Sequence, residues 1–162
     1  MKKVLMLICA LCVVASGTFF VANAQEEMTP EELAASAVSF RKALFRTIYF
    51  NLRPIGAMAQ GAPFDAEVAQ RNANRIAVIA SMIPEVFAEN TSEFSMIETT
   101  ALPTIWENME DFESKAQALI DNANAFSEAA STGDFTQAMG AFRAFGGSCG
   151  NCHDTYRVDE DE

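Results

Sequence analysis

The sequence predicts an all-α fold, an antiparallel four-helix bundle. The main ground for this prediction is the spacing of hydrophobic residues along the chain. Apolar residues recur every three or four positions in four long segments, which is the period of an amphipathic helix, and no segment alternates like a β-strand. Two short turns and one longer connection join the segments, as in antiparallel bundles. With 162 residues, 50% of them hydrophobic, the chain has the size and composition of one globular domain.

The first two helices have clear starting points. Thr29-Pro30-Glu31-Glu32 forms a capping box with proline at the first helical position, so the first helix is expected to run to about Met58. Pro54 is placed to kink its last turns. Asp65 caps the second helix, which we expect Pro84 to stop. The predicted core stripe of the first helix is Leu33, Ala37, Phe40, Leu44, Ile48, Leu52 and Ile55.

The last two helices follow the long connection, expected at residues 85–101, where sustained periodicity is missing. The third helix is predicted from near Pro103 to Gly133, which is expected to form its C-cap. Asp134 caps the fourth helix. In this helix the pair Gly146-Gly147 either leaves room for another group to approach the backbone or interrupts the helix.

The N-terminus has the pattern of a secretory signal peptide. Lys2 and Lys3 precede an apolar run, and Ala22-Asn23-Ala24 places small residues where signal peptidase cleaves, so residues 1–24 are expected to be removed. A transmembrane anchor is the alternative, because Val4 to Val21 is just long enough to span a bilayer. No basic stop-transfer cluster follows this run. The mature domain is therefore expected at residues 25–162, with no membrane anchor after cleavage.

The charge of the chain limits its partners. Eleven Lys and Arg stand against 22 Asp and Glu, and removal of Lys2 and Lys3 takes the net charge from −11 to −13. This sign argues against nucleic acid and against an anionic membrane surface, because both are bound by Lys and Arg. By electrostatic steering, an acidic surface favours a basic partner.

The remaining cysteines form a motif with a specific chemistry. Cys9 and Cys12 leave with the signal peptide, whereas Cys149-Gly150-Asn151-Cys152-His153 is the C-x-x-C-H pattern of c-type haem attachment. Two thiols at this spacing on a helix can add to the two vinyl groups of one haem, and the adjacent imidazole can reach the iron. The sequence thus predicts one haem c per chain, held by two thioethers, with His153 as metal ligand.

Two other uses of the motif fit the sequence less well. Redox-active C-x-x-C disulfides lie near the start of a helix in a βαβ setting, and no strand pattern is present here. A structural zinc site needs four ligands, whereas this motif offers three. His153 is the only histidine of the chain, so its use by iron leaves none for a hydrolytic triad, and we expect a protein that is not an enzyme.

The sixth position of the iron must come from earlier helices or stay empty. Only nine residues follow His153, and none of them is Met, unlike in small cytochromes whose motif lies near the N-terminus. The candidate sulfur ligands are Met28, Met58, Met82, Met96, Met109 and Met139, although such residues commonly fill cores.

Several segments in order make the mature chain resemble the cytochrome c′ family, the class II c-type cytochromes. The matching segments are Phe40–Ala43, Gly56–Met58, Gly61–Ala66, Pro103–Trp106, Asp111–Lys115 and Cys149–Arg157. The resemblance implies a haem c in a four-helix bundle, a homodimer, and the periplasm of a Gram-negative bacterium.

The resemblance also implies roles for residues around the haem. Cys149 and Cys152 match the thioether cysteines, and His153 matches the proximal ligand. Arg41 matches an arginine that contacts a haem propionate, and Lys42 matches a position that lies against the haem. Both have a simpler interpretation as solvated helix charges.

Further positions are implied on the two faces of the iron. Phe45 falls where relatives place the apolar residue that covers the vacant face, and it can also be plain core packing. Arg157 matches an arginine beside the proximal histidine, Thr100 falls near another haem contact, and Trp106 is expected to pack against the haem. Low-spin relatives use a first-helix Met as sixth ligand, and none lies near Phe45.

The function expected from the residues and the resemblance is a five-coordinate, high-spin haem protein that binds the gases NO and CO or transfers electrons. The alternative is an electron carrier with a closed, low-spin, six-coordinate haem and a Met ligand. A thiol redox enzyme remains only if haem is absent. A basic redox partner is expected from the acidic composition.

Overall fold

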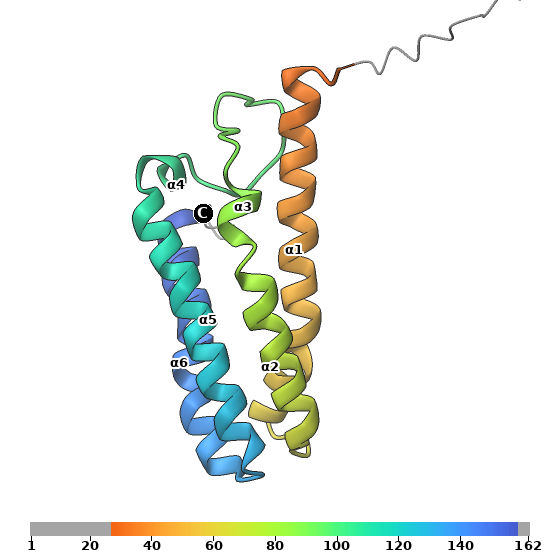
Figure 1. Cartoon of the computed structure of the whole chain (residues 1–162), viewed down its shortest axis with the longest axis vertical. Helices are drawn as coiled ribbons and strands as arrows, with labels where there is room; N and C mark the ends of the chain where they lie inside the picture. The colour runs from red at the N-terminus through yellow and green to blue at the C-terminus, as the bar shows by residue number, and fades with distance from the viewer. Residues whose placement is uncertain (1–26, 159–162) are drawn as a thin grey trace, which may run out of the picture.

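The structure is a computed structural model in which residues 27–158 are described, so the predicted signal peptide and its cleavage site lie outside the described residues. The helices are α1 (Pro30–Ala59), α2 (Ala66–Ala80), α3 (Ile83–Val86), α4 (Thr104–Glu107), α5 (Met109–Ser131) and α6 (Phe135–Tyr156). The four long helices form a bundle in which α1 packs on α2, α2 on α5, and α5 on α6 (Figure 1). The predicted four-helix bundle is confirmed. Between residues 27 and 158, no helix is long and apolar enough to cross a membrane.

The helix starts follow the local rules read from the sequence. The Thr29 hydroxyl accepts a hydrogen bond from the backbone N–H of Glu32, whose carboxylate accepts one from the Thr29 N–H, so the capping box is present. Asp65 caps α2 and Asp134 caps α6 through backbone N–H groups of their first turns. The hydrogen bonds from Gln137 and Thr136 lower the pKa of Asp134, because they favour the charged carboxylate.

Two predicted helix boundaries are wrong. Helix α2 ends at Ala80, and Pro84 lies in the first turn of α3, where a backbone N–H is not needed. The predicted third helix is divided into α4 and α5 at Asn108, whose φ of −134° and ψ of 47° are not helical. The Asn108 side-chain amide donates to the carbonyl of Thr104, and such local bonds compete with the helical ladder.

The glycines of α6 do not interrupt it. The helix is continuous through Gly146 and Gly147, and a Cβ placed at Gly147 or Gly150 would meet no atom within 4 Å. No neighbouring helix therefore needs the space that these two glycines leave. Glycine is required instead at Gly61 and Gly133, which end helices with φ values of 103° and 75°.

The core stripe of α1 differs from the predicted one. Leu33 and Phe40 were expected in the core, but they are 49% and 64% exposed. The buried positions of α1 in this region are Ala34, Val38, Arg41, Leu44 and Ile48. The reason is that α1 carries two apolar stripes, and the periodicity of one helix does not indicate which of two stripes faces the bundle.

Candidate functional site

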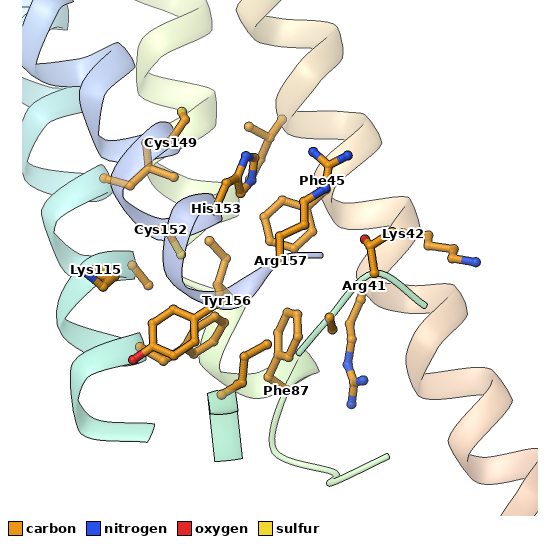
Figure 2. A pocket seen from close by; sticks show the side chains of 18 of the residues that line it. Arg41, Lys42, Phe45, Phe87, Lys115, Cys149, Cys152, His153, Tyr156 and Arg157 are labelled. Atoms are coloured by element: carbon orange, nitrogen blue, oxygen red, sulfur yellow. The ribbon is translucent and has the colours of Figure 1, made fainter. Parts of the chain in front are cut away.

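A cavity of about 480 Å³ lies between α1, α5, α6 and the connection before α4 (Figure 2). This volume is in the range of small-molecule and cofactor sites. Most of its wall is apolar, including Ile48, Leu52, Phe87, Ile105, Phe112 and Leu119. The connection is held in place by the end of α6, because the Val158 N–H donates to the Thr100 carbonyl and the Leu102 N–H donates to the Tyr156 carbonyl.

The C-x-x-C-H motif faces this cavity. Cys149, Cys152 and His153 lie on one face of α6 and line the cavity together (Figure 2). Helical geometry explains this placement, since residues three and four positions apart share a face. Both cysteines are free thiols and half-buried.

The electrostatics of the thiols argue against a redox-active pair. Burial raises the pKa of Cys149, and burial is also the main cause that raises the pKa of Cys152, against the opposing effect of Lys115. A thiol–disulfide enzyme needs a lowered pKa, because the thiolate is the attacking species. The direction of both shifts is therefore opposite to the one that a thiol redox centre needs.

His153 is held in the form that binds iron. Burial and, to a lesser extent, the positive charge of Arg157 lower its pKa, while Asp154 opposes them. The imidazole is therefore neutral at pH 7, and neutral imidazole is the ligand form.

Phe45 lies across the cavity from His153. The centroids of the two rings are 6.5 Å apart, and the Phe45 ring also packs against Phe87 at 6.3 Å. Phe45 is half-buried and offers no donor atom. Of residues 27–158, no methionine lines the cavity, so none of the six candidate sulfur ligands is placed near His153.

The residues present fit a covalently bound haem. The cavity brings together two thiols, one imidazole and an apolar wall, which match the vinyl groups, the iron and the porphyrin ring. Zinc is a poorer fit, because no three His, Cys, Asp or Glu side chains of the described chain gather around one point.

The sequence profile of the cytochrome c′ family matches residues 36–157. The chain belongs to the cytochrome c′ family. It is 37% identical over 119 residues to cytochrome c-554 of Cereibacter sphaeroides, covering 72% of this chain and 77% of the relative. It is 32% identical over 121 residues to cytochrome c′ of Pararhodospirillum photometricum, covering 74% and 94% of the two chains.

Solved structures agree with this assignment. Cytochrome c′ from Shewanella frigidimarina superposes with a TM-score of 0.71 and 37% identity, covering 78% of this chain and 97% of the other. A nitric oxide complex of a cytochrome c′ variant from Alcaligenes xylosoxidans superposes with a TM-score of 0.68 and 28% identity, covering 78% and 97%. Family membership, together with Cys149 and Cys152, makes this chain a haem c protein.

Arg41 is buried and hydrogen-bonded, so it is not the solvated helix charge of the simpler interpretation. The side chain is only 3% exposed, and its Nε and terminal nitrogens donate to the carbonyls of Val86 and Glu89 and to the Thr91 hydroxyl. Burial lowers the pKa of Arg41, which nevertheless stays charged because the ordinary value is so high.

The guanidinium of Arg41 is also enclosed by aromatic rings, 4.6 Å from the centroid of Phe87 and 5.1 Å from that of Trp106. Arginine has five N–H donors, and the three hydrogen bonds leave donors for a haem propionate. The propionate contact of cytochromes c′ stays a prediction here. The structure adds a second role, in which Arg41 ties α1 to the segment after α3.

We predict that Arg41→Met lowers the free energy of unfolding by about 2–4 kcal/mol, because the carbonyls of Val86 and Glu89 lose a charged donor. Urea denaturation of the haem-containing protein measures this change. Arg53→Met is the matched control, because Arg53 is exposed on the same helix and its replacement should change stability by less than about 0.5 kcal/mol. Equal effects of the two substitutions would show that Arg41 does not anchor the segment.

Three of the other predicted haem contacts, Lys42, Thr100 and Arg157, also line the cavity. Lys42 donates from Nζ to the Glu98 carbonyl at 2.8 Å. Arg157 pairs with Ala101 in an isolated β-bridge, and Thr100 lies beside this bridge. Their contacts with haem stay predictions. Trp106, expected against the haem, is not part of the cavity wall. Its indole N–H donates to the Phe87 carbonyl.

The spacing in the sequence places Tyr156 on the helical face of Cys149, Cys152 and His153, and it lines the cavity as expected, whereas Arg46, Phe87 and Lys115 were missed as site residues. The Tyr156 hydroxyl donates to the Asp111 carboxylate at 2.6 Å, and Lys115 is 3.7 Å from the same carboxylate oxygen. Burial and this hydrogen bond raise the pKa of Tyr156 to about 12. Tyr156 carried a signal because it lies three positions after His153 on the same helical face, and nothing in the spacing indicated the three missed residues.

Proposed function

We propose that this cytochrome c′ family member binds NO and CO at a five-coordinate haem iron and transfers single electrons. One observation carries the proposal: the cavity has the imidazole of His153 on one side and the non-coordinating ring of Phe45 on the other. The haem supplies an open coordination position for the gas and a one-electron couple. The nitric oxide complex of a related cytochrome c′ supports NO as a ligand.

The ring of Phe45 and the lack of a second histidine determine how the gases are expected to bind. An incoming ligand must displace the half-buried phenyl ring, and because this cost is similar for every gas, it lowers all affinities by the same factor and leaves the intrinsically weakest ligand bound least. His153 is the only histidine, so no second imidazole is available to donate a hydrogen bond to bound O₂. The expected order of affinity is NO, then CO, then O₂.

The absorption spectrum of the oxidised protein, the reduced protein and the reduced protein with CO tests this proposal. We expect high-spin spectra and a clear change on addition of CO. A low-spin reduced spectrum, with a methionine–iron charge-transfer band in the oxidised protein, would favour the six-coordinate electron carrier instead.

We further infer that the protein acts in the periplasm as a binding and carrier protein rather than as an enzyme. The signal pattern of residues 1–24 and membership of the cytochrome c′ family support export. The single histidine faces the cavity as a candidate iron ligand, so it does not serve acid–base chemistry elsewhere. Cell fractionation tests the location, and recovery of the protein in the cytoplasmic fraction with residues 1–24 intact would contradict it.

We propose that two copies of this chain form a homodimer whose interface is the exposed face of α1. Uncharged residues follow a heptad spacing along this face: Leu33, Ser36, Phe40, Ala43, Thr47 and Phe50. Phe40 and Phe50 are 64% and 68% exposed, and rows of exposed aromatic residues mark interaction sites. A related cytochrome c′ is described as having a ligand-controlled dimer dissociation, which supports a second copy as the occupant.

We predict that Phe50→Glu converts this dimer into a monomer at micromolar concentration, because it places two carboxylates in a largely apolar interface. Sedimentation velocity measures the change. Val78→Glu on α2 is the control, because Val78 is 63% exposed and lies outside the heptad row. A monomeric wild-type protein, or a dimer that survives Phe50→Glu, would contradict the proposed interface.

A further inference from the structure

A buried phenol with a carboxylate partner lies in the wall of the haem cavity. Tyr156 on α6 is 4% exposed and lines the cavity together with Cys152 and His153. Its hydroxyl donates to Oδ2 of Asp111 on α5 at 2.6 Å. This distance is typical of strong hydrogen bonds from a hydroxyl to a charged acceptor. The function proposed above, gas binding at the iron, uses neither Tyr156 nor Asp111.

The pair connects a buried hydroxyl to water. The Asp111 side chain is 56% exposed, and Lys115 lies 3.7 Å from the same carboxylate oxygen. A carboxylate within about 2.6–3.2 Å of a hydroxyl is placed to take its proton. Because Asp111 is exposed, a proton that it accepts can pass on to solvent. In Figure 2 the ring of Tyr156 lies on the same side of the motif as Lys115.

The other oxidisable side chains near the cavity lack this arrangement. The chain has two tyrosines, and Tyr49 also lines the cavity, but it is 63% exposed and no described residue hydrogen-bonds its hydroxyl. Trp106, the only tryptophan, and the methionines of residues 27–158 do not line the cavity. Cys149 and Cys152 are the haem-attachment cysteines. Tyr156 is therefore the oxidisable side chain at the haem whose proton has an acceptor in place.

We propose that Tyr156 is a redox-active residue that supplies one electron when a hydroperoxide oxidises the haem, and that Asp111 accepts the phenol proton. The inference rests on the open iron position of the proposed function. A hydroperoxide takes two electrons, and one-electron oxidation of the iron accounts for only one of them, so a second donor is required. A phenol in the cavity wall supplies this electron and spares the porphyrin ring from oxidation.

Hydrogen peroxide takes one electron from the ferric haem and one from Tyr156. Its O–O bond breaks, one oxygen leaves as water with both peroxide hydrogens, and the other oxygen stays with the haem. The O–H bond of Tyr156 also breaks. Its proton passes to the Asp111 carboxylate and its electron passes through the haem to the peroxide, which leaves a neutral phenoxyl radical on Tyr156.

Electron paramagnetic resonance tests the assignment on the ferric, haem-containing protein, frozen rapidly after mixing with hydrogen peroxide. We expect a tyrosyl radical in the wild type and its loss in Tyr156→Phe, which keeps the ring that packs on Phe112 at 5.3 Å. Tyr49→Phe is the matched control, because it removes the only other tyrosine, and should keep the signal. No tyrosyl radical in the wild type, or one that disappears in Tyr49→Phe and persists in Tyr156→Phe, would overturn the proposal.

Asp111→Asn tests the proton acceptor. Asparagine keeps a side-chain oxygen for the phenol hydrogen bond but is not a base, so the radical yield should fall several-fold although Tyr156 is still present. Asp121→Asn is the matched control, because Asp121 is exposed on the same helix and hydrogen-bonds Gln117, and it should leave the yield unchanged. A wild-type yield in folded Asp111→Asn would show that the hydrogen bond only ties α5 to α6.

Two absorption measurements separate this inference from the proposed function. If CO changes the spectrum of the reduced protein and no Tyr156 radical forms, gas binding stands and the redox role of Tyr156 fails. If CO does not bind, the iron position is closed and both fail. During exposure to hydrogen peroxide, the haem band should bleach several-fold faster in Tyr156→Phe than in Tyr49→Phe, because the second electron is then taken from the porphyrin ring. Equal bleaching of the two variants would contradict the proposal.

Discussion

Covalent haem is expected to disappear completely in the double variant Cys149→Ser/Cys152→Ser. Both thiols line the same cavity as His153, and each can form one thioether, whereas a serine hydroxyl does not replace a thiol in this addition. Intact-mass measurement of protein exported from a strain with c-type cytochrome maturation should show one haem on the wild-type chain. The double variant should have the mass of the bare polypeptide.

The control for this experiment is Thr155→Ala, which changes an exposed position of the same helix and should retain one covalent haem. Loss of haem also leaves the 480 Å³ cavity without its covalent occupant, so we expect the double variant to be less stable. Circular dichroism checks that it is still helical. A wild-type mass equal to the bare chain minus two hydrogens would indicate a disulfide and contradict the haem assignment.

The second large effect is expected at Phe45, where Phe45→Ala should raise the association rate of CO about tenfold or more. Moving the half-buried ring away from a ligand exposes apolar surface at a cost on the order of 1–2 kcal/mol, and about 1.4 kcal/mol in a barrier is tenfold in rate. Alanine removes the ring and with it this cost. Stopped-flow mixing of reduced protein with CO measures the rate.

Two controls accompany this variant. Phe45→Leu keeps an apolar side chain over the cavity and should give a smaller increase. Phe135→Ala removes a ring that packs on Phe64 and lies outside the cavity wall, so the CO rate should not change. Because Phe45 is only half-buried, we expect its truncation to cost less than the roughly 3–5 kcal/mol of a fully buried Phe. An unchanged CO rate in folded Phe45→Ala would show that Phe45 does not control access.

Local features were predictable because their causes lie within a few residues. The capping box at Thr29 and Glu32, the caps at Asp65 and Asp134, and the shared face of the C-x-x-C-H motif each depend on neighbours in sequence. The break at Asn108 was not predictable from periodicity, since apolar spacing continues from α4 into α5. Periodicity also failed to show that Leu33 and Phe40 are exposed, because α1 carries two apolar stripes and only one of them faces the core.

The sequence by itself determined the fold class, the helix starts and the haem-attachment motif, because periodicity, capping and motif spacing are properties of short segments. Only the tertiary structure decided what Arg41 binds, since its partners lie 45 to 50 residues away. It also decided that Phe45 faces His153 and that the Tyr156 hydroxyl on α6 meets the Asp111 carboxylate on α5. Such pairings depend on how each helix is rotated about its axis and placed along its neighbours, and the spacing of residues within one helix does not specify either quantity.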